Sequence, residues 1–318
     1  MSISSLYQAL TTQFFESYNT HKRNCPYLGV RHKFMKTITN IEYYNQEKIK
    51  DTDFLWKFVS LDKFLSTIIN QKLYFTRLDR FEDCLEGANP NLLLLNLLKK
   101  NILNTNAFKE IQQIHGIDLF PSKTDELIEK LKEIQLFNFA NCWFISSKNV
   151  ESTAMWNLYS SKNSVALNIS YKNFIESIKK YNLKSRIVEK LTLGPIDYID
   201  FQNPEEIANQ KNNNWYNPFI KDKSFSHENE FRLVAEIEKY EINPIKYKEG
   251  ISKYYQDEFH KKTSQIYGLD ICFEEFINYN FEVVFHPKSE DWFKNDVNCL
   301  LSKLDIPFKT RDSNLKLK

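Results

Sequence analysis

The sequence has few glycines and no closely spaced pair of cysteines. Only 6 of its 318 residues are glycine, and its five cysteines are scattered without a C-x-x-C pair. An odd number of separated thiols indicates neither a disulfide framework nor a zinc site, and is typical of a reducing compartment. We therefore expect reduced thiols, no metal site and a cytoplasmic location.

Charge of one sign and long apolar runs are also lacking. The 43 Lys and Arg residues nearly balance the 41 Asp and Glu residues, which leaves a formal charge of +2. No overall basic field attracts nucleic acid or an anionic membrane, although a local basic patch stays open. The N-terminus shows neither a signal peptide nor an apolar run long enough to cross a bilayer, so we expect no membrane association.

Several common catalytic motifs are absent. The chain has no G-x-x-x-x-G-K-[ST] and no G-x-G-x-x-G, so neither a P-loop nor an ordinary Rossmann fold is supported. It also lacks H-E-x-x-H and G-x-S-x-G. Its six histidines are isolated from one another, and only His227, beside an acidic pair, lies near other candidate residues.

Aromatic residues are abundant. The 25 Phe, 17 Tyr and 5 Trp need a core to bury them, which argues against disorder. Helical and strand patterns are intermixed without a regular βαβ repeat, so we predict an α+β fold with a mixed or antiparallel sheet. The clearest strands are expected at 54–58, 72–76, 139–147, 164–170, 188–200 with a turn at Gly194–Pro195, 230–238 and 281–287, and the clearest helices at 61–70, 151–161, 171–181 and 289–304.

We expect one catalytic domain, residues 51–318, preceded by a helical extension, residues 1–50. The extension is suggested by helical spacing of apolar residues in 3–18. A leucine-rich stretch whose apolar residues exceed one helical face predicts a helical insertion at about 90–135.

The segment "SHENEFRLVAEI", residues 226–237, joins a charged face to an apolar one. Alternation in a strand places Glu228, Glu230 and Arg232 on one face, opposite Phe231 and Leu233. Such a charged face is by default a solvated edge with weak ion pairs. The other interpretation is a cleft wall, in which Arg232 holds two carboxylates for chemistry. The pattern alone favours exposure.

Other candidates have two interpretations each. Asp83 and Glu86, in "FEDCLEG", are either turn and cap residues or members of a charge network with Arg77, Arg80 or Arg232. The run of residues 221–223 is either a phosphate contact or a solvated loop, and the loop is favoured.

Aromatic neighbours raise the same question. Trp156 and Tyr159 lie three apart on a helical turn, a spacing more typical of a core than of a cofactor platform. Lys57 stands between two rings on a strand, so it is either exposed or paired with a carboxylate or phosphate.

Three segments resemble the bacterial family of unknown function called DUF2971. They are residues 55–87, 141–169 and 219–234, and the resemblance covers roughly residues 53–240. The chain departs from the family pattern at Glu82, Cys84 and Phe231. Its matching positions are Trp56, Lys57, Phe58, Phe81, Asp83, Glu86, Gly87, Cys142, Phe144, Ser146, Met155, Trp156, Tyr159, Lys223, Glu228, Glu230 and Arg232.

The order of these parts is also similar to ADP-ribosyltransferases of the DNA- and RNA-modifying toxin type. Those enzymes have a strand–helix–strand opening, an aromatic that packs on nicotinamide, and a late glutamate, often as E-x-E. The resemblance implies NAD as substrate, Glu230 as the main catalytic carboxylate, Glu228 orienting the acceptor, and Arg232 holding both. A carboxylate suits this chemistry because it stabilises the oxocarbenium-like ribose that forms as nicotinamide leaves.

The resemblance assigns the NAD-binding residues and partners as well. Lys57 or Arg77 would contact phosphate, and Trp156 or Tyr159 would pack on a ring. Asp83 and Glu86 would line the same pocket. The expected function is that of a toxin or antiphage-defence effector, which modifies a nucleic-acid or protein acceptor or hydrolyses NAD. A cognate antitoxin or defence-system partner is implied.

Two other functions stay open. The first is a carboxylate-based nuclease that acts on RNA or DNA, with Asp83, Glu86, Glu228 and Glu230 as metal ligands or bases. The second is a non-enzymatic sensor or partner-binding module, in which these charges hold a ligand pocket.

Overall fold

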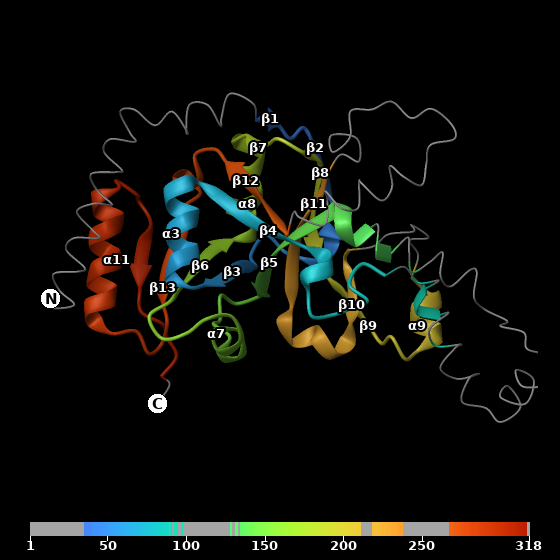
Figure 1. Ribbon diagram of the computed structural model, residues 1–318. Coiled ribbons are helices and arrows are strands. Elements are labelled where there is room, and N and C mark those ends of the chain that lie inside the picture. Colours follow the sequence, from blue (N-terminus) through green and yellow to red (C-terminus); the bar gives the residue numbers. More distant parts are fainter. Residues whose placement is uncertain are drawn as a thin grey trace, which may run out of the picture.

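The computed structural model describes residues 35–88, 134–210, 218–237 and 267–316, together with separate positions between 90 and 132. The α+β prediction is confirmed. A 12-stranded, mostly antiparallel mixed sheet forms the centre of the molecule, and helices lie against it (Figure 1). The main strand order is β1-β7-β12-β4-β5-β3-β6-β13-β14, and β11, β8 and β2 branch from β5.

The predicted strand–helix–strand opening is confirmed. Strand β3 spans Phe54–Val59, helix α3 spans Leu61–Asn70, and strand β4 spans Lys72–Arg77. Strand β4 buries alternate residues, whereas β3 buries Leu55 on one face and Trp56 on the other. Helix α3 buries Phe64 and Ile68, which lie one helical turn apart. The helix ends at Gln71, whose left-handed backbone (φ 48°) turns the chain directly into β4.

Strand β5, Asn138–Ser146, is where the sheet branches. One edge pairs along most of its length with β11, Glu230–Ile237. The other edge pairs with β4 only at residues 139–140 and with β3 only at residues 144–146. Strands β3 and β4 therefore diverge, and a break in the sheet lies between them beside residues 141–143 of β5.

The two faces of the sheet are covered differently. On one, the helical face, α3, α8 (Tyr171–Lys180) and α11 (Asp291–Lys303) pack on the largest core cluster. The opposite face, which we call the site face, carries α7 (Thr153–Tyr159) over Trp56 and Phe58. Farther along it, the segment after β4 and the small sheet of β9 (Asp197–Ile199) and β10 (Ile220–Asp222) pack near Ala140 and Val234.

The remaining elements extend the sheet or connect its strands. Their bounds are β1 Lys36–Thr37, β2 Asn40–Tyr43, η1 Gln46–Lys48, η2 Leu78–Arg80, β6 Val165–Ser170, β7 Leu183–Ser185, β8 Val188–Pro195, α9 Pro204–Ala208, η3 Lys223–Glu228, β12 Gly268–Phe273, η4 Phe276–Asn278, β13 Glu282–Phe285 and β14 Lys309–Arg311.

Some expectations differ from the structure or fall outside it. The 188–200 segment contains no turn at Gly194–Pro195, because β8 continues to Pro195 while pairing with β11. Residues 1–34 and most of the insertion at about 90–135 lie outside the described residues. The described end of the predicted extension, residues 35–50, contributes β1 and β2 to the sheet and contains the short 3-10 helix η1. Among the described residues, no helix is long and apolar enough to span a membrane.

Candidate functional site

Strand β11 turns the charged face of "SHENEFRLVAEI" inward. Its odd-numbered residues, such as Phe231 and Leu233, join the helical-face core, as the alternation predicts. Glu230 and Arg232 point to the site face, but they are 4% and 0% exposed. The preference for a solvated edge is therefore wrong for this pair, because the segment after β4 and the β9–β10 sheet cover that face.

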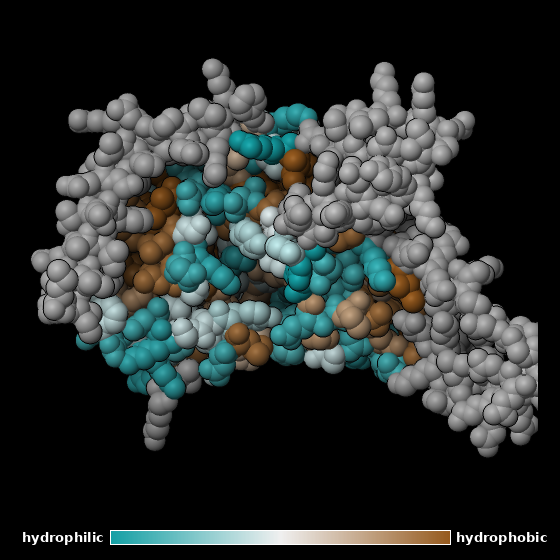
Figure 2. Space-filling model, viewed as in Figure 1, coloured by the Kyte–Doolittle hydropathy of each residue, from teal (hydrophilic) through white to brown (hydrophobic). Residues whose placement is uncertain are grey.

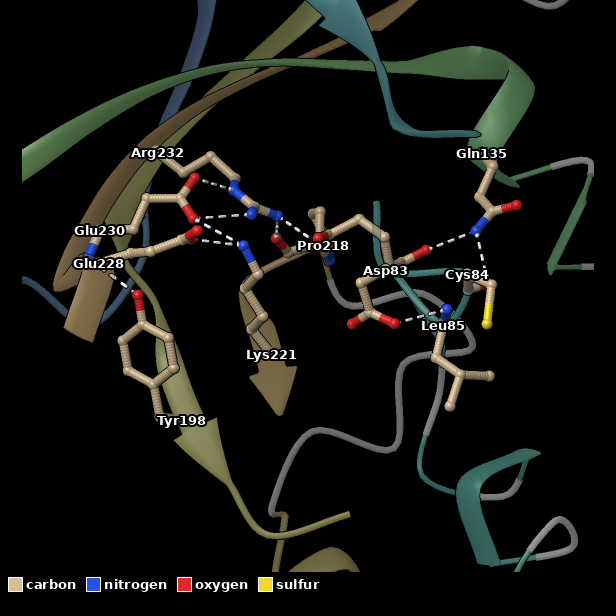
Figure 3. Close-up of polar contacts among 11 residues, drawn as sticks. Asp83, Cys84, Leu85, Gln135, Tyr198, Pro218, Lys221, Glu228, Glu230 and Arg232 are labelled. Atoms are coloured by element: carbon tan, nitrogen blue, oxygen red, sulfur yellow. Dashed lines mark hydrogen bonds and ion pairs between the residues drawn. The ribbon is translucent and has the colours of Figure 1, made fainter. Parts of the chain in front are cut away.

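Arg232 lies at the centre of a buried ion network (Figure 3). Its Nε and Nη2 donate to the two oxygens of Glu230 at 2.8 and 2.9 Å, a bidentate arrangement. Its Nη1 donates to Glu86 Oε1 at 2.5 Å and to the carbonyl oxygen of Pro218 at 2.7 Å. The guanidinium also stands 5.3 Å from the ring centre of Phe81. One arginine thus joins β11 to the loop after β4.

The two acids that Arg232 holds differ in their electrostatics. The pKa of Glu230 is lowered, because the Arg232 charge and hydrogen bonds outweigh its burial. The pKa of Glu86 is raised, because burial outweighs the single hydrogen bond from Arg232. Glu86 Oε2 is buried and has no hydrogen-bond partner among the described residues. Glu230 is therefore committed to an ion pair, and Glu86 is its less satisfied neighbour.

Lys221 connects this buried pair to a more accessible carboxylate. Its Nζ donates to Glu228 Oε2 at 2.6 Å and lies 3.7 Å from Glu230 Oε2. The hydroxyl of Tyr159, from α7, donates to Glu228 Oε1 at 2.8 Å. The side chain of Glu228 is 13% exposed, against 5% for Glu230 and 0% for Glu86. Of the three carboxylates, Glu228 is the one that solvent reaches most.

Two further side chains border Glu230. The Tyr198 hydroxyl accepts a hydrogen bond from the backbone N–H of Glu230 at 3.0 Å. Burial and the nearby Glu230 charge raise the pKa of Tyr198. Burial and a hydrogen bond to Glu230 raise the pKa of the Cys142 thiol, which lies across from Arg232 in the sheet. Both groups are therefore neutral hydrogen-bonding partners at neutral pH.

Lys57 occupies the break between β3 and β4. Its Nζ donates to the carbonyl oxygen of Cys142 at 2.9 Å and lies 5.4 Å from the ring centre of Trp143. Burial lowers the pKa of Lys57 to about 8, because the charged ammonium is poorly solvated there. The side chain remains partly exposed. Lys57 matches neither interpretation, because its partner is a backbone carbonyl and strand alternation places it with Leu55 and Val59 on the helical face, opposite Glu230 and Arg232.

The position of α7, which carries Tyr159, is fixed by Glu151. This buried carboxylate accepts hydrogen bonds from Trp156 Nε1 at 3.1 Å, Arg311 Nη1 at 2.9 Å and the Asn314 backbone N–H at 2.8 Å, as well as from Ser313 Oγ. The C-terminal segment thereby anchors the helix over the site face.

The other predicted residues lie elsewhere. Trp156 is 0% exposed and packs against Phe58 in the core, so Tyr159 is the aromatic of this pair that reaches the acidic network. Arg77 is buried in a bidentate pair with Asp79 rather than with the Glu230 network. Asp83 accepts from the Leu85 backbone N–H at 2.9 Å, so it forms a turn and does not contact Arg232.

The site does not suit a metal ion. Among the described residues, no three His, Cys, Asp or Glu side chains are grouped so that they could hold one. Arg232 and Lys221 separate the carboxylates of Glu86, Glu228 and Glu230 and neutralise them. The four-acid metal site of the nuclease interpretation is thus not assembled.

Comparison with known proteins covers part of this site. The family model described as a protein of unknown function, DUF2971, matches residues 155–233. This region is a DUF2971 match. The match comprises 79 of the 318 residues. It is shorter than the segment 53–240 over which the sequence resembles the family. No curated protein and no solved structure matches the chain.

The DUF2971 region supplies only part of the network. Tyr159, Lys221, Glu228, Glu230 and Arg232 lie within it. Two other residues of the site come from outside it, Cys142 from β5 and Glu86 from the loop after β4. The site is therefore completed by residues before the matched region.

Sequence reasoning missed two members of the network. The sequence favours a solvated loop at 221–223, and the family pattern points to Lys223. In the structure Lys221 is the buried lysine, 5% exposed, whereas Lys223 is exposed. The available signal was the short strand β10, Ile220–Asp222. Lys221 lies within this strand, whereas Lys223 follows it. Tyr198 carried no signal, because a single tyrosine in a mixed segment is not distinctive.

Proposed function

We propose that the chain cleaves the nicotinamide–ribose bond of NAD and transfers ADP-ribose to an acceptor hydroxyl or to water. The observation that carries this proposal is the fixed, partly exposed carboxylate of Glu228, held by Tyr159 on one oxygen and Lys221 on the other. A carboxylate has about four acceptor positions, so Glu228 retains capacity for a substrate hydrogen bond.

In this reaction the C–N bond to nicotinamide breaks and a C–O bond to the acceptor forms. Positive charge builds on the ribose as nicotinamide leaves, and the Glu228 carboxylate would stabilise it. The same carboxylate would take the proton that the attacking hydroxyl loses. Glu230 and Arg232 are both buried, so they would position β11 and set the local electrostatic potential rather than contact substrate.

The sequence assigned the main role to Glu230, and the geometry favours Glu228. Both oxygens of Glu230 are engaged by the Arg232 fork, and burial withholds them from a ligand. Accepting a substrate there would require breaking a charge-assisted bidentate pair, which is costly in a buried setting. Glu228 needs no such rearrangement.

The test is nicotinamide release from NAD by the purified full-length chain, measured by chromatography with water, single-stranded DNA, single-stranded RNA or protein as acceptor. Glu228→Gln keeps the side-chain shape and should lower turnover by roughly 100-fold or more. Glu176→Gln, an exposed carboxamide change on α8, is the matched control and should retain activity. No nicotinamide release with any acceptor, or equal turnover in Glu228→Gln, would refute the proposal.

A further inference from the structure

The break in the sheet between β3 and β4 is bordered by side chains rather than by paired strands. Cys142, in the middle of β5, pairs with Arg232 on β11, but neither β3 nor β4 pairs with it on the other edge. Figure 2 shows the surface hollowed at this place, beside α3 and between the positions that β3 and β4 have in Figure 1, with hydrophilic residues in the hollow. Lys57 of β3 is accordingly only half-buried. The break is therefore accessible to a small ligand.

Two side chains from the helical face bind the backbone at the break. Lys57 Nζ donates to the carbonyl oxygen of Cys142 at 2.9 Å, and Asn141 Nδ2 donates to that of Tyr74 at 2.7 Å. The residues two positions before and after Lys57 and Asn141 belong to the helical-face core, which fixes this orientation. An ammonium has three N–H donors, and the described residues engage one of them, so Lys57 has further donors for a ligand.

A second cation lies near the same place. Lys63 is in the first turn of α3 and is exposed. The pKa of Lys57 is lowered chiefly by burial and also by the nearby charge of Lys63. Among the described residues, neither lysine forms an ion pair with a carboxylate. Two neighbouring cations without a counter-ion favour the binding of an anion.

Polar groups in the core beside Lys57 also lack partners. The Trp143 ring is centred 5.4 Å from Lys57 Nζ, and Trp143 is 2% exposed. Its Nε1 has no hydrogen-bond partner among the described residues, and neither has Asn141 Oδ1, which is also buried. Buried polar groups without a partner are rare, because each is desolvated without compensation. The break thus holds more hydrogen-bonding capacity than the surrounding residues use.

We propose that the break between β3 and β4 is a phosphate-binding site, in which Lys57 and Lys63 supply the positive charge. Lysine binds phosphate as a point charge, and two lysines match a dianion better than they match the single charge of a carboxylate. A phosphate group also supplies several acceptor oxygens for the donors that Lys57 retains. Free phosphate and a phosphate monoester share this chemistry, so the experiment compares both.

This site lies apart from the one that carries the proposed function. Strand alternation places Lys57 on the helical face, whereas Glu230 and Arg232 point to the site face. Phosphate binding is measured without turnover. It can therefore be observed when no nicotinamide is released, and it can be absent when nicotinamide release is observed.

Lys57 has a structural use as well, because it satisfies a Cys142 carbonyl that no strand pairs with. If this were its whole role, Lys57→Met would lower the melting temperature, and the wild-type chain would show no saturable phosphate binding. Lys63 is exposed, and its side chain forms no hydrogen bond with a described residue. Replacing Lys63 therefore tests the charge without disturbing the core.

The experiment titrates the full-length chain with inorganic phosphate, ribose 5-phosphate or acetate in phosphate-free buffer at pH 7 and follows binding by calorimetry. Phosphate should bind more tightly than acetate. Lys57→Met should weaken phosphate binding by about 10- to 150-fold, the equivalent of one charge-assisted hydrogen bond. Lys63→Gln should weaken it by about 2- to 5-fold, because a cation at an exposed position contributes less. Tighter binding of ribose 5-phosphate than of phosphate identifies a monoester as the ligand, and the reverse order identifies the free ion.

Lys72 is the matched control. It is half-buried like Lys57, but its Nζ donates to Asp270 Oδ2 at 2.5 Å, so its charge is already compensated. Lys72→Met should therefore leave the affinity for phosphate unchanged. No saturable binding by the wild-type chain, or acetate binding as tight as that of phosphate, would overturn the site. Equal losses in Lys57→Met and Lys72→Met, or wild-type affinity in Lys63→Gln, would do so as well.

Discussion

Replacing Arg232 with leucine would leave two buried acids without their shared cation. The side chain is fully buried and donates two hydrogen bonds to Glu230, one to Glu86 and one to the Pro218 carbonyl. Among the described residues, the cation left beside Glu230 would be Lys221, 3.7 Å away. Removing one partner of a buried ion pair typically costs about 3–5 kcal/mol, because a charge remains desolvated. We expect a loss of that size in the free energy of unfolding.

The assay is thermal and urea unfolding followed by circular dichroism at pH 7. The expected loss corresponds to a fall in melting temperature on the order of 10 °C for a chain of this size. Lys190→Met removes a cation from a surface pair with Glu42 at 2.7 Å and should cost less than about 1 kcal/mol. If Arg232→Leu lowers the free energy of unfolding no more than this control does, the buried network does not stabilise the fold.

The pH dependence of the free energy of unfolding tests the same network in a second way. In the wild type the pKa of Glu230 is lowered, so its stabilisation is present above its unfolded pKa and is lost as the pH falls through the folded value. In Arg232→Leu, desolvation without the fork should raise that pKa instead. The variant should therefore gain stability as the pH falls from 7 toward 5. A variant that loses stability over this interval would contradict the electrostatic account.

Two further predictions concern single positions. Because burial lowers the pKa of Lys57 to about 8, below its usual value in the unfolded chain, the folded protein binds fewer protons above that pH, so the free energy of unfolding in urea should rise relative to that of Lys57→Met between about pH 8 and 10. An equal pH dependence of stability in the wild type and in Lys57→Met would assign the titration to another group. Gly194→Ala should lower stability by about 1–3 kcal/mol in urea unfolding, because its Cβ would stand 2.3 Å from the Tyr44 carbonyl oxygen. Wild-type stability in that variant would show that β2 moves aside at little cost.

Local patterns predicted the elements that carry the site. The strand–helix–strand opening at residues 54–77 and the alternation in β11 follow from the spacing of apolar residues, which reports directly on which face each residue presents. Strand β12 was not predicted. Its pairing with β4 is a long-range contact that no local pattern encodes.

The assignment of partners could not be read from the sequence. The sequence leaves Glu86 either as a turn residue or as a member of a charge network with one of three arginines, and only the fold of the loop after β4 brings it to Arg232 at 2.5 Å. Likewise Trp156 and Tyr159 were equivalent by spacing, but α7 buries the first and directs the second to Glu228. Spacing along one helix does not determine what packs against it.

The sequence by itself determined that this is an α+β protein with a charged face on one late strand, because periodicity is a local property of the chain. Whether that face meets water was decided by the tertiary structure. The segment after β4 and the β9–β10 sheet lie over Glu230 and Arg232 and exclude solvent from them. Glu228 is therefore the carboxylate of the network that solvent reaches most. Burial depends on which distant segments cover a strand, and for that reason the carboxylate that is open to a ligand emerged only from the fold.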